Sequence, residues 1–232
     1  MIEEPAQLTV NKARNRPTAA QIAAFQGVQT SFVADALGGD GALDPAIRPL
    51  GEGRDIRCVA AGPALTADAG PADILATYAA LHFLSPGDIL VVAFGGHQRC
   101  AAVGDRVMGM VRNNEAAGFV TDGPVRDYAG IVDVGLPVWC TGLNPASPFS
   151  NGPGTVGLPI SIGGRQVATG DMICGDRDGV VVVPFDQIDT VIARLAEIHK
   201  LEAKLDAEVA NGRRHADKVA RLIEDGKINY VG

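Results

Sequence analysis

The sequence has 232 residues, of which 47% are hydrophobic and 20% charged, so it can form a folded α/β domain and global disorder is not expected. The net charge is −7 with a pI near 5.0, and no block of lysines and arginines suggests nucleic-acid binding. The longest apolar runs, ILVVAF and GVVVV, are too short to span a membrane. The first ten residues, MIEEPAQLTV, lack the apolar segment of a signal peptide. These features predict a cytoplasmic protein with no membrane and no nucleic acid among its partners.

In chain order, glycine-bounded apolar segments alternate between helical and extended periodicity up to about residue 140. The first predicted helix begins after Thr18 and ends near Gly27, and a second, TSFVADALGG, stops at Gly38. The remaining elements predicted in this part are strands at 57–68, 89–94, 118–122 and 136–140, and helices at 74–84 and 106–117.

The last third of the chain has a different pattern. Residues 141–158 are rich in Pro, Gly, Ser and Asn, which predicts a long loop that is either functional or mobile. Short strands separated by Gly-Gly, Thr-Gly and Asp-Gly turns follow as far as residue 184. Residues 186–210 carry apolar side chains at helical spacing, which predicts one long helix packed across a neighbour. We therefore predict a single mixed α/β domain over residues 1–232, with a core at about 28–185 and C-terminal helices at about 186–226.

Two carboxylates and a guanidinium are predicted to meet at one end of this domain. Asp105 starts the predicted helix 106–117, which runs about 18 Å in one direction. The strand 118–122 runs about 17 Å back and delivers Arg126 and Asp127 just beyond its turn. Two carboxylates suit Mg²⁺ or Mn²⁺, and an adjacent arginine can bind a substrate carboxylate through paired hydrogen bonds. The free N–H groups at the helix start would add an anion-binding surface, so the cluster suits a 2-oxo acid.

The same residues carry a resemblance to a known family. The pattern Gly-Asp-x(20)-Arg-Asp, preceded by AAVGD, resembles the signature of class II pyruvate aldolases, which cleave 4-hydroxy-4-methyl-2-oxoglutarate or 4-carboxy-4-hydroxy-2-oxoadipate. This family is similar to the regulator of ribonuclease activity A. The resemblance extends over about residues 28–212 through TSFVADALGG, GFVTDGPVRD, LPVWCTGLNP and GDMICGDRDGVVVVP. It implies a swivelling β/β/α-type core and assembly as a homotrimer or homohexamer.

The resemblance also implies a role for each matching position. Asp127 would ligate a divalent metal, and Asp105 would hold the same metal through water. Arg126 would bind the substrate and assist proton transfer, while the backbone from Gly104 through Asp105 and Arg106 to Val107 would bind the pyruvyl carboxylate. Glu202 would approach the site from a neighbouring subunit.

The expected activity is metal-dependent retro-aldol cleavage of a 4-hydroxy-2-oxo acid to pyruvate, with oxaloacetate decarboxylation as a side reaction. The alternative is a non-catalytic regulator that binds a ribonuclease; as the resemblance has it, such regulators lack the aspartate that this chain keeps at Asp127. Two positions depart from the family pattern: Gly130 stands where some members have an acid, and Arg106 where many have a small or aliphatic residue.

The other chemically reactive side chains are expected to be structural or solvated. His82 is predicted to be a core residue, and His97, in a glycine loop, is a weaker candidate for lining the site. The GDRDG turn at 175–179 and the cysteines, which are widely spaced without a CxxC pair, are predicted to be structural.

Overall fold

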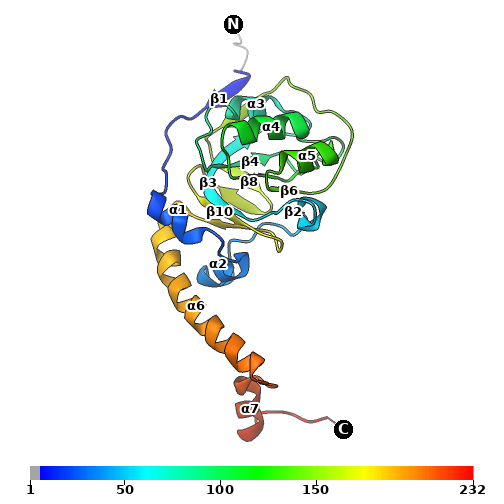
Figure 1. Ribbon diagram of the computed structural model, residues 1–232. Coiled ribbons are helices and arrows are strands. Elements are labelled where there is room, and N and C mark those ends of the chain that lie inside the picture. The colour runs from blue at the N-terminus through cyan, green and yellow to red at the C-terminus, as the bar shows by residue number, and fades with distance from the viewer. Residues whose placement is uncertain (1–5, 232) are drawn as a thin grey trace. The chain divides into compact units, whose positions relative to one another are not determined.

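The computed structural model describes residues 6–231 and shows an α/β fold (Figure 1). The chain divides into two compact units, one extending to Leu195 and the other beginning at Ala196. The boundary between them falls inside the long helix α6 (Ile188–Ala210). The first unit contains the sheet and every residue of the predicted metal and substrate cluster except Glu202.

A mixed nine-stranded sheet organises the described part of the first unit. Its main path is β1-β7-β3-β4-β5-β6-β2, and β10 joins β3 to β11. From β3 to β6 each strand is parallel to the next, whereas β2 and β10 pair antiparallel with β6 and β3. The strands of this sheet are β1 (Leu8–Val10), β2 (Arg48–Pro49), β3 (Ala60–Asp68), β4 (Ile89–Ala93), β5 (Gly118–Thr121), β6 (Val138–Cys140), β7 (Gly154–Val156), β10 (Met172–Gly175) and β11 (Val180–Val183).

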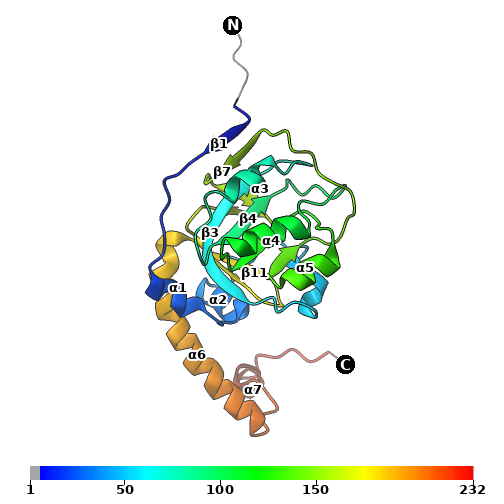
Figure 2. The same ribbon diagram turned by 45° about the horizontal axis from the view of Figure 1, so that its top comes forward.

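The parallel strands are apolar because both faces of the sheet are covered. Helices α3, α4 and α5 lie over one face (Figures 1 and 2). The hairpin of β8 (Ile160–Ile162) and β9 (Arg165–Val167) contacts β3 and β4 through β8, and in Figure 1 it lies behind them. The helices are α1 (Ala19–Phe25), α2 (Thr30–Ala36), α3 (Leu75–Ala80), α4 (Asp105–Asn113), α5 (Tyr128–Val134), α6 and α7 (Asp217–Glu224), with 3₁₀ turns at Leu50–Gly53 and Phe185–Gln187.

Most predicted elements are present with small shifts at their ends. The Thr18 side chain caps α1, as expected, and Gln21 completes the capping box. Helix α4 ends earlier than predicted because the chain turns at Glu115, whose φ is +57°. The prediction of a continuous loop at 141–158 was wrong at its end, where β7 pairs with β1 and with β3. Those partners lie far away in the sequence, so no local pattern indicates them.

Several expectations about individual residues were tested by burial and hydrogen bonding. All four cysteines are free and buried, as predicted. Asp176 of the GDRDG turn accepts hydrogen bonds from the backbone N–H of Thr30 at 2.8 Å and from its hydroxyl at 2.7 Å, so this turn is structural. The prediction for His82 was wrong, because α3 ends at Ala80 and the following turn leaves the imidazole exposed.

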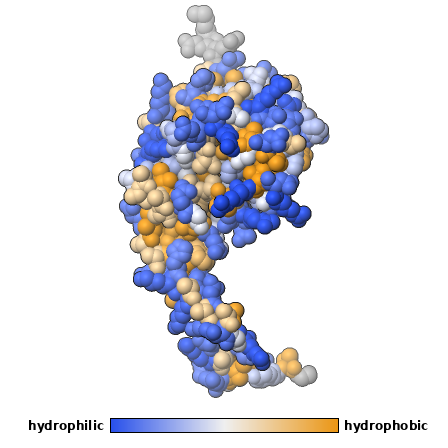
Figure 3. Space-filling model, viewed as in Figure 1, coloured by the Kyte–Doolittle hydropathy of each residue, from blue (hydrophilic) through white to orange (hydrophobic). Residues whose placement is uncertain are grey.

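The second unit consists of the later part of α6 together with α7. Figure 3 shows apolar and polar side chains intermixed along this segment. Leu201, Leu205 and Val209 are large exposed apolar residues of α6, which continue the predicted stripe beyond the first unit. No helix within residues 6–231 combines the length and the apolar composition needed to cross a lipid bilayer.

Candidate active site

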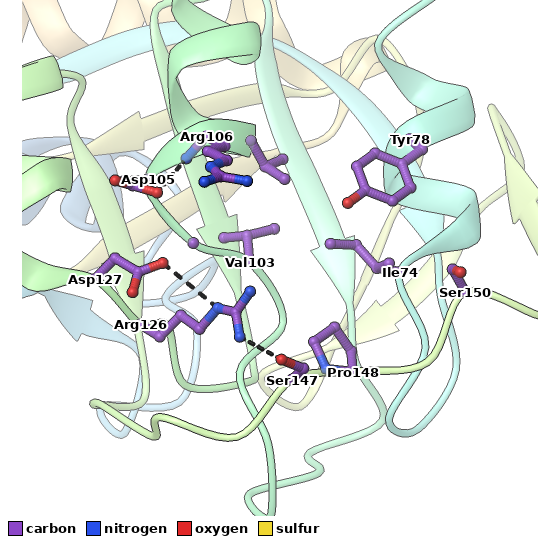
Figure 4. A pocket seen from close by; sticks show the side chains of 12 residues that line it. Ile74, Tyr78, Val103, Asp105, Arg106, Arg126, Asp127, Ser147, Pro148 and Ser150 are labelled. Atoms are coloured by element: carbon purple, nitrogen blue, oxygen red, sulfur yellow. Dashed lines mark hydrogen bonds and ion pairs between the residues drawn. The ribbon is translucent and has the colours of Figure 1, made fainter.

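A cavity of about 560 Å³ opens at the carboxyl ends of the parallel strands, where ligands commonly bind in α/β sheets. One side is formed by the start of α4 and the connection between β5 and α5, and the other by α3 and the segment after β6 (Figure 4). The lining residues are Ile74, Tyr78, Val103, Gly104, Asp105, Arg106, Val107, Arg126, Asp127, Ser147, Pro148 and Ser150.

Hydrogen bonds beyond the strand ends hold the connecting segments in register. The Arg126 N–H donates to the Val103 carbonyl at 3.0 Å, and the Val125 N–H donates to the Gly142 carbonyl at 2.9 Å. Asp122 accepts from the backbone N–H groups of Phe94 and Gly96, and burial raises the pKa of this carboxyl. Three successive connections are therefore fixed side by side beneath the cavity.

Arg126 and Asp127 form an open ion pair in which Nε lies 3.5 Å from Oδ2. Their side chains are 35% and 47% exposed, respectively. One Arg126 amino group donates to the Ser147 hydroxyl, whereas Nε is buried without a hydrogen bond. Asp127 precedes α5 with φ +61° and ψ +48°, a left-handed conformation that aspartate tolerates better than most residues. The pair is thus held in place without being fully satisfied, as expected of groups that bind a ligand.

Two glycines make room for the carboxylates. A methyl group on Gly104 would contact Asp127 Oδ2 and lie 3.1 Å from Cγ of Arg126. A methyl group on Gly130 would lie 2.7 Å from Cβ of Asp105. Both distances are shorter than van der Waals contact, so only glycine lets the two side chains take these positions. Gly130, where the family pattern can have an acidic residue, therefore leaves the space that the Asp105 side chain occupies.

The amino terminus of α4 faces the same cavity. Its first intrahelical hydrogen bond joins the Met108 N–H to the Gly104 carbonyl, so the preceding N–H groups have no helical acceptor. The Arg106 N–H donates to Asp105 Oδ1 at 2.6 Å, which leaves those of Asp105 and Val107 without an acceptor among the described residues. Unpaired N–H groups and the helix dipole together favour an anion here.

The sequence analysis did not predict the individual residues of the opposite wall of the cavity. The segment after β6, predicted to be functional or mobile, contributes Ser147, Pro148 and Ser150. It is fastened to the start of α3, since Asp73 accepts from the N–H groups of Asn151 at 2.7 Å and of Leu75 at 2.8 Å. Ile74 and Tyr78 complete this wall from α3, and their local sequence pattern signals only an apolar helix.

The structure brings six predicted site residues into one cavity: Gly104, Asp105, Arg106, Val107, Arg126 and Asp127. Glu202 lies on α6 in the second unit and is not part of the lining. His97 is also absent from the lining and packs edge-on against Phe94 with ring centroids 5.7 Å apart. The chemical roles assigned to all of these residues stay predictions.

Comparison with protein families identifies the class to which this fold and site belong. The model of the RraA-like family, described as Aldolase/RraA, matches residues 30–182. The chain therefore belongs to the RraA-like family, whose proteins include both aldolases and RraA proteins.

Individual relatives carry names of both kinds. A protein of Halalkalibacterium halodurans, provisionally named 4-hydroxy-4-methyl-2-oxoglutarate aldolase, is 36% identical over 173 residues, covering 75% of this chain and 80% of the relative. The structure of Streptomyces coelicolor RraAS2, described as an unusual member of the RNase ES inhibitor RraA family, has a TM-score of 0.73 at 25% identity and covers 83% of this chain and all of the other. An uncharacterized protein from Pseudomonas syringae shares the fold with a TM-score of 0.74 at 24% identity, covering 86% and 92% of the two chains.

Proposed function

We propose that this protein catalyses divalent-metal-dependent retro-aldol cleavage of a 4-hydroxy-2-oxo acid to pyruvate. The observation that carries the proposal is the convergence of Asp105, Arg126 and Asp127, from two separate strand–helix connections, on one cavity beside the free end of α4. The aldolase name of the relative from Halalkalibacterium halodurans supports the same reaction class.

The donor set suits a hard cation that keeps part of its water shell. Asp105 and Asp127 line the cavity, and among residues 6–231 there is no cluster of three or more His, Cys, Asp or Glu side chains placed to hold a metal. Mg²⁺ is commonly held by one or two carboxylates, with water and substrate oxygens completing its octahedron. Within the described residues, the Asp105 carboxylate accepts only the Arg106 N–H and the Asp127 carboxylate accepts no hydrogen bond, so both keep oxygens that such a cation or its water could use. We assign Asp127 as the direct ligand and Asp105 as the ligand acting through water, with Mg²⁺ or Mn²⁺ as the metal.

The chain's own groups provide the substrate contacts. Arg126 projects into the cavity and can bind the carboxylate at C1 of the 2-oxo acid. The N–H groups of Asp105 and Val107 offer hydrogen bonds to the same anion. A bound Mg²⁺ or Mn²⁺ would polarise the 2-oxo carbonyl and stabilise the negative charge of the pyruvate enolate.

The reaction then needs two proton transfers. The C4 hydroxyl loses its proton to a base as the C3–C4 bond breaks, and the bonding electrons pass into the enolate of pyruvate. A proton is then added at C3 to give pyruvate, while C4 leaves as a carbonyl compound. Asp105 is the cavity carboxylate that can orient a water molecule for these transfers, and Arg126 would favour the deprotonated form of that water. Oxaloacetate would release CO₂ and form the same enolate, which makes decarboxylation a natural side activity.

We further propose that the protein acts as a homotrimer or homohexamer and that Glu202 of a neighbouring subunit completes the site. The exposed apolar side chains of Leu201, Leu205 and Val209 on α6 support burial of this helix in an assembly. Specific activity should then fall on dilution to the monomer, as measured by assay beside light scattering. Unchanged activity in a verified monomer would remove Glu202 from the site.

The central proposal is tested by pyruvate release coupled to lactate dehydrogenase. The substrates are 4-hydroxy-4-methyl-2-oxoglutarate and oxaloacetate, each with Mg²⁺ or Mn²⁺ and then with excess EDTA. We expect release from at least one substrate and its loss in EDTA. Absence of release from both would favour the alternative, a non-catalytic regulator that binds a ribonuclease, in keeping with the inhibitor family to which Streptomyces coelicolor RraAS2 is assigned.

A further inference from the structure

Arg106 is a cation in the cavity that the fold itself does not use. It lines the cavity together with Arg126, and its guanidinium makes no hydrogen bond or ion pair within the part of the chain that the structure describes. Arg126, by contrast, is joined to Ser147 and to Asp127. A long, flexible side chain without a structural contact can be retained for a ligand contact.

The position of Arg106 at the start of α4 places its positive charge beside the cavity. It is the second residue of the helix, and helical side chains lean toward the amino terminus, which here faces the cavity. Arg112, farther along the same helix, instead donates to the Val134 carbonyl and does not line the cavity. The two arginines thus differ in environment, one facing the cavity and the other fixed to α5.

The charges lining the cavity indicate the charge of its ligand. Asp105 and Asp127 carry −2 together, and Arg106 and Arg126 carry +2, so the lining sums to zero. With the divalent cation of the proposed function, the site would carry +2. A 2-oxo acid with one carboxylate neutralises half of this charge, and a second carboxylate neutralises the remainder.

We propose that Arg106 is a specificity-determining residue that binds the second carboxylate of the substrate, on the C4 side of the bond that breaks. The fragment released with pyruvate is then itself an anionic oxo acid and not a neutral aldehyde or ketone. This inference rests on the proposed function. It assigns Arg126 and the end of α4 to the C1 carboxylate, and Arg106 to the carboxylate beyond C4.

A competing neutral fragment would have to be recognised by the opposite wall. Ile74 and Pro148 are apolar there, and Tyr78 is 41% exposed. These residues can pack against a methyl group on C4, but they provide no charge for a carboxylate. Among the described residues that line this cavity, Arg106 is the only cationic side chain besides Arg126, so it is the residue whose change should separate the two substrate classes.

The experiment compares two substrates that differ in one group. Retro-aldol cleavage of 4-hydroxy-4-methyl-2-oxoglutarate gives two pyruvates, and that of 4-hydroxy-4-methyl-2-oxopentanoate, with a methyl in place of the second carboxylate, gives pyruvate and acetone. The ratio of kcat/KM for the diacid to that for the monoacid is measured in the unmodified protein, in Arg106→Gln and in Arg106→Lys. Arg112→Gln is the matched control on the same helix.

We expect Arg106→Gln to lower this ratio about 30-fold, the range for loss of a charge-assisted hydrogen bond. The ratio for Arg106→Lys should lie between those of Arg106→Gln and the unmodified protein, because lysine keeps the charge but lacks the planar guanidinium. Arg112→Gln should keep the ratio within about twofold of the unmodified protein. An unchanged ratio in Arg106→Gln, or an equal fall in Arg112→Gln, would overturn the assignment.

Exchange of the pyruvate methyl protons in D₂O tests the enolate chemistry of the proposed function separately from the role of Arg106, because exchange requires the enolate but no second carboxylate. Exchange by the unmodified protein together with an unchanged ratio in Arg106→Gln would overturn the role of Arg106 alone. Neither exchange nor cleavage by the unmodified protein would overturn the proposed function and this inference with it.

Discussion

Two arginine–aspartate clusters lie at opposite ends of the parallel strands and differ in how completely their charges are used. Before β4, Asp88 is 0% exposed; Oδ2 accepts from Arg14 at 2.7 Å and from the Ser85 N–H at 2.8 Å, and Oδ1 accepts from Arg16. After β5, Asp127 is 47% exposed and lies 3.5 Å from Arg126, whose Nε has no hydrogen bond.

The comparison shows how the same residue types serve two purposes. In the first cluster every acceptor is matched by a donor, so the buried charge is compensated and ties the N-terminal segment to the turn before β4. In the second cluster the Asp127 carboxylate accepts no hydrogen bond from the described residues, pairs only loosely with Arg126 and faces a cavity, so it can bind a ligand. Substitutions should therefore change stability at one end and activity at the other.

The largest effect is expected for Asp127→Asn. Loss of the proposed metal ligand should lower metal-dependent pyruvate formation about 1,000-fold, because a polarising cation contributes several kcal/mol to the barrier. Thermal stability should change little, since asparagine also tolerates the left-handed backbone. The measurement is kcat beside the melting temperature, and near-normal turnover in this variant would remove Asp127 from the site.

The next effect is expected for Asp88→Asn, and it should appear in stability. Two arginines would lose a buried partner, which should cost about 3 kcal/mol of unfolding free energy. For a chain of this size that lowers Tm by roughly 6–12 °C, whereas kcat well below Tm should be retained.

The matched control for Asp88 is Glu52→Gln, which breaks the exposed pair between Glu52 and Arg54. An exposed pair contributes little, so Tm should shift by less than about 2 °C. Equal Tm shifts in Asp88→Asn and Glu52→Gln would contradict the expectation that the buried ion pairs of Asp88 stabilise the fold more than the exposed pair of Glu52.

Arg126→Lys should reduce kcat/KM about 100-fold while leaving Tm nearly unchanged. Lysine keeps a positive charge but cannot form two parallel hydrogen bonds with a carboxylate or reach Ser147 in the same geometry. Steady-state kinetics with the best substrate found would measure this loss. Retention of full activity would mean that charge alone, and not the planar fork, is required.

The smallest effect is expected for Gly130→Ala. Its methyl group would lie 2.7 Å from Cβ of Asp105, so this carboxylate must shift, and activity should fall about tenfold. Gly109→Ala on α4 is the control, because its methyl would meet only Val134, at 4.0 Å. That control should keep its activity and gain slightly in Tm. Equal activities in the two variants would argue against a required position for Asp105.

Much of the cavity's polar side could be predicted from local sequence. Helix 106–117 and strand 118–122 were placed closely enough for Asp105, Arg126 and Asp127 to be expected at one end of the sheet, and the structure has them lining one cavity. A helix that follows one parallel strand runs back along the sheet, and the next strand covers a similar length in the opposite direction, so a short helix–strand unit returns near its start. The exposure of His82 shows the limit, since apolar neighbours did not reveal where α3 ends.

The sequence by itself determined the order of the elements, their glycine boundaries and the residues that carry chemistry on one side of the cavity. Only the tertiary structure decided that Tyr78 and Ser147 form the opposite wall of the cavity and that β7 pairs with β1. It also decided the ion pairs of Arg14 and Arg16 with Asp88. These contacts join residues far apart in the chain, and their free energy comes from burial and pairing that exist only once the sheet has formed. Local periodicity encodes an element and its faces, but not which distant segment will cover them.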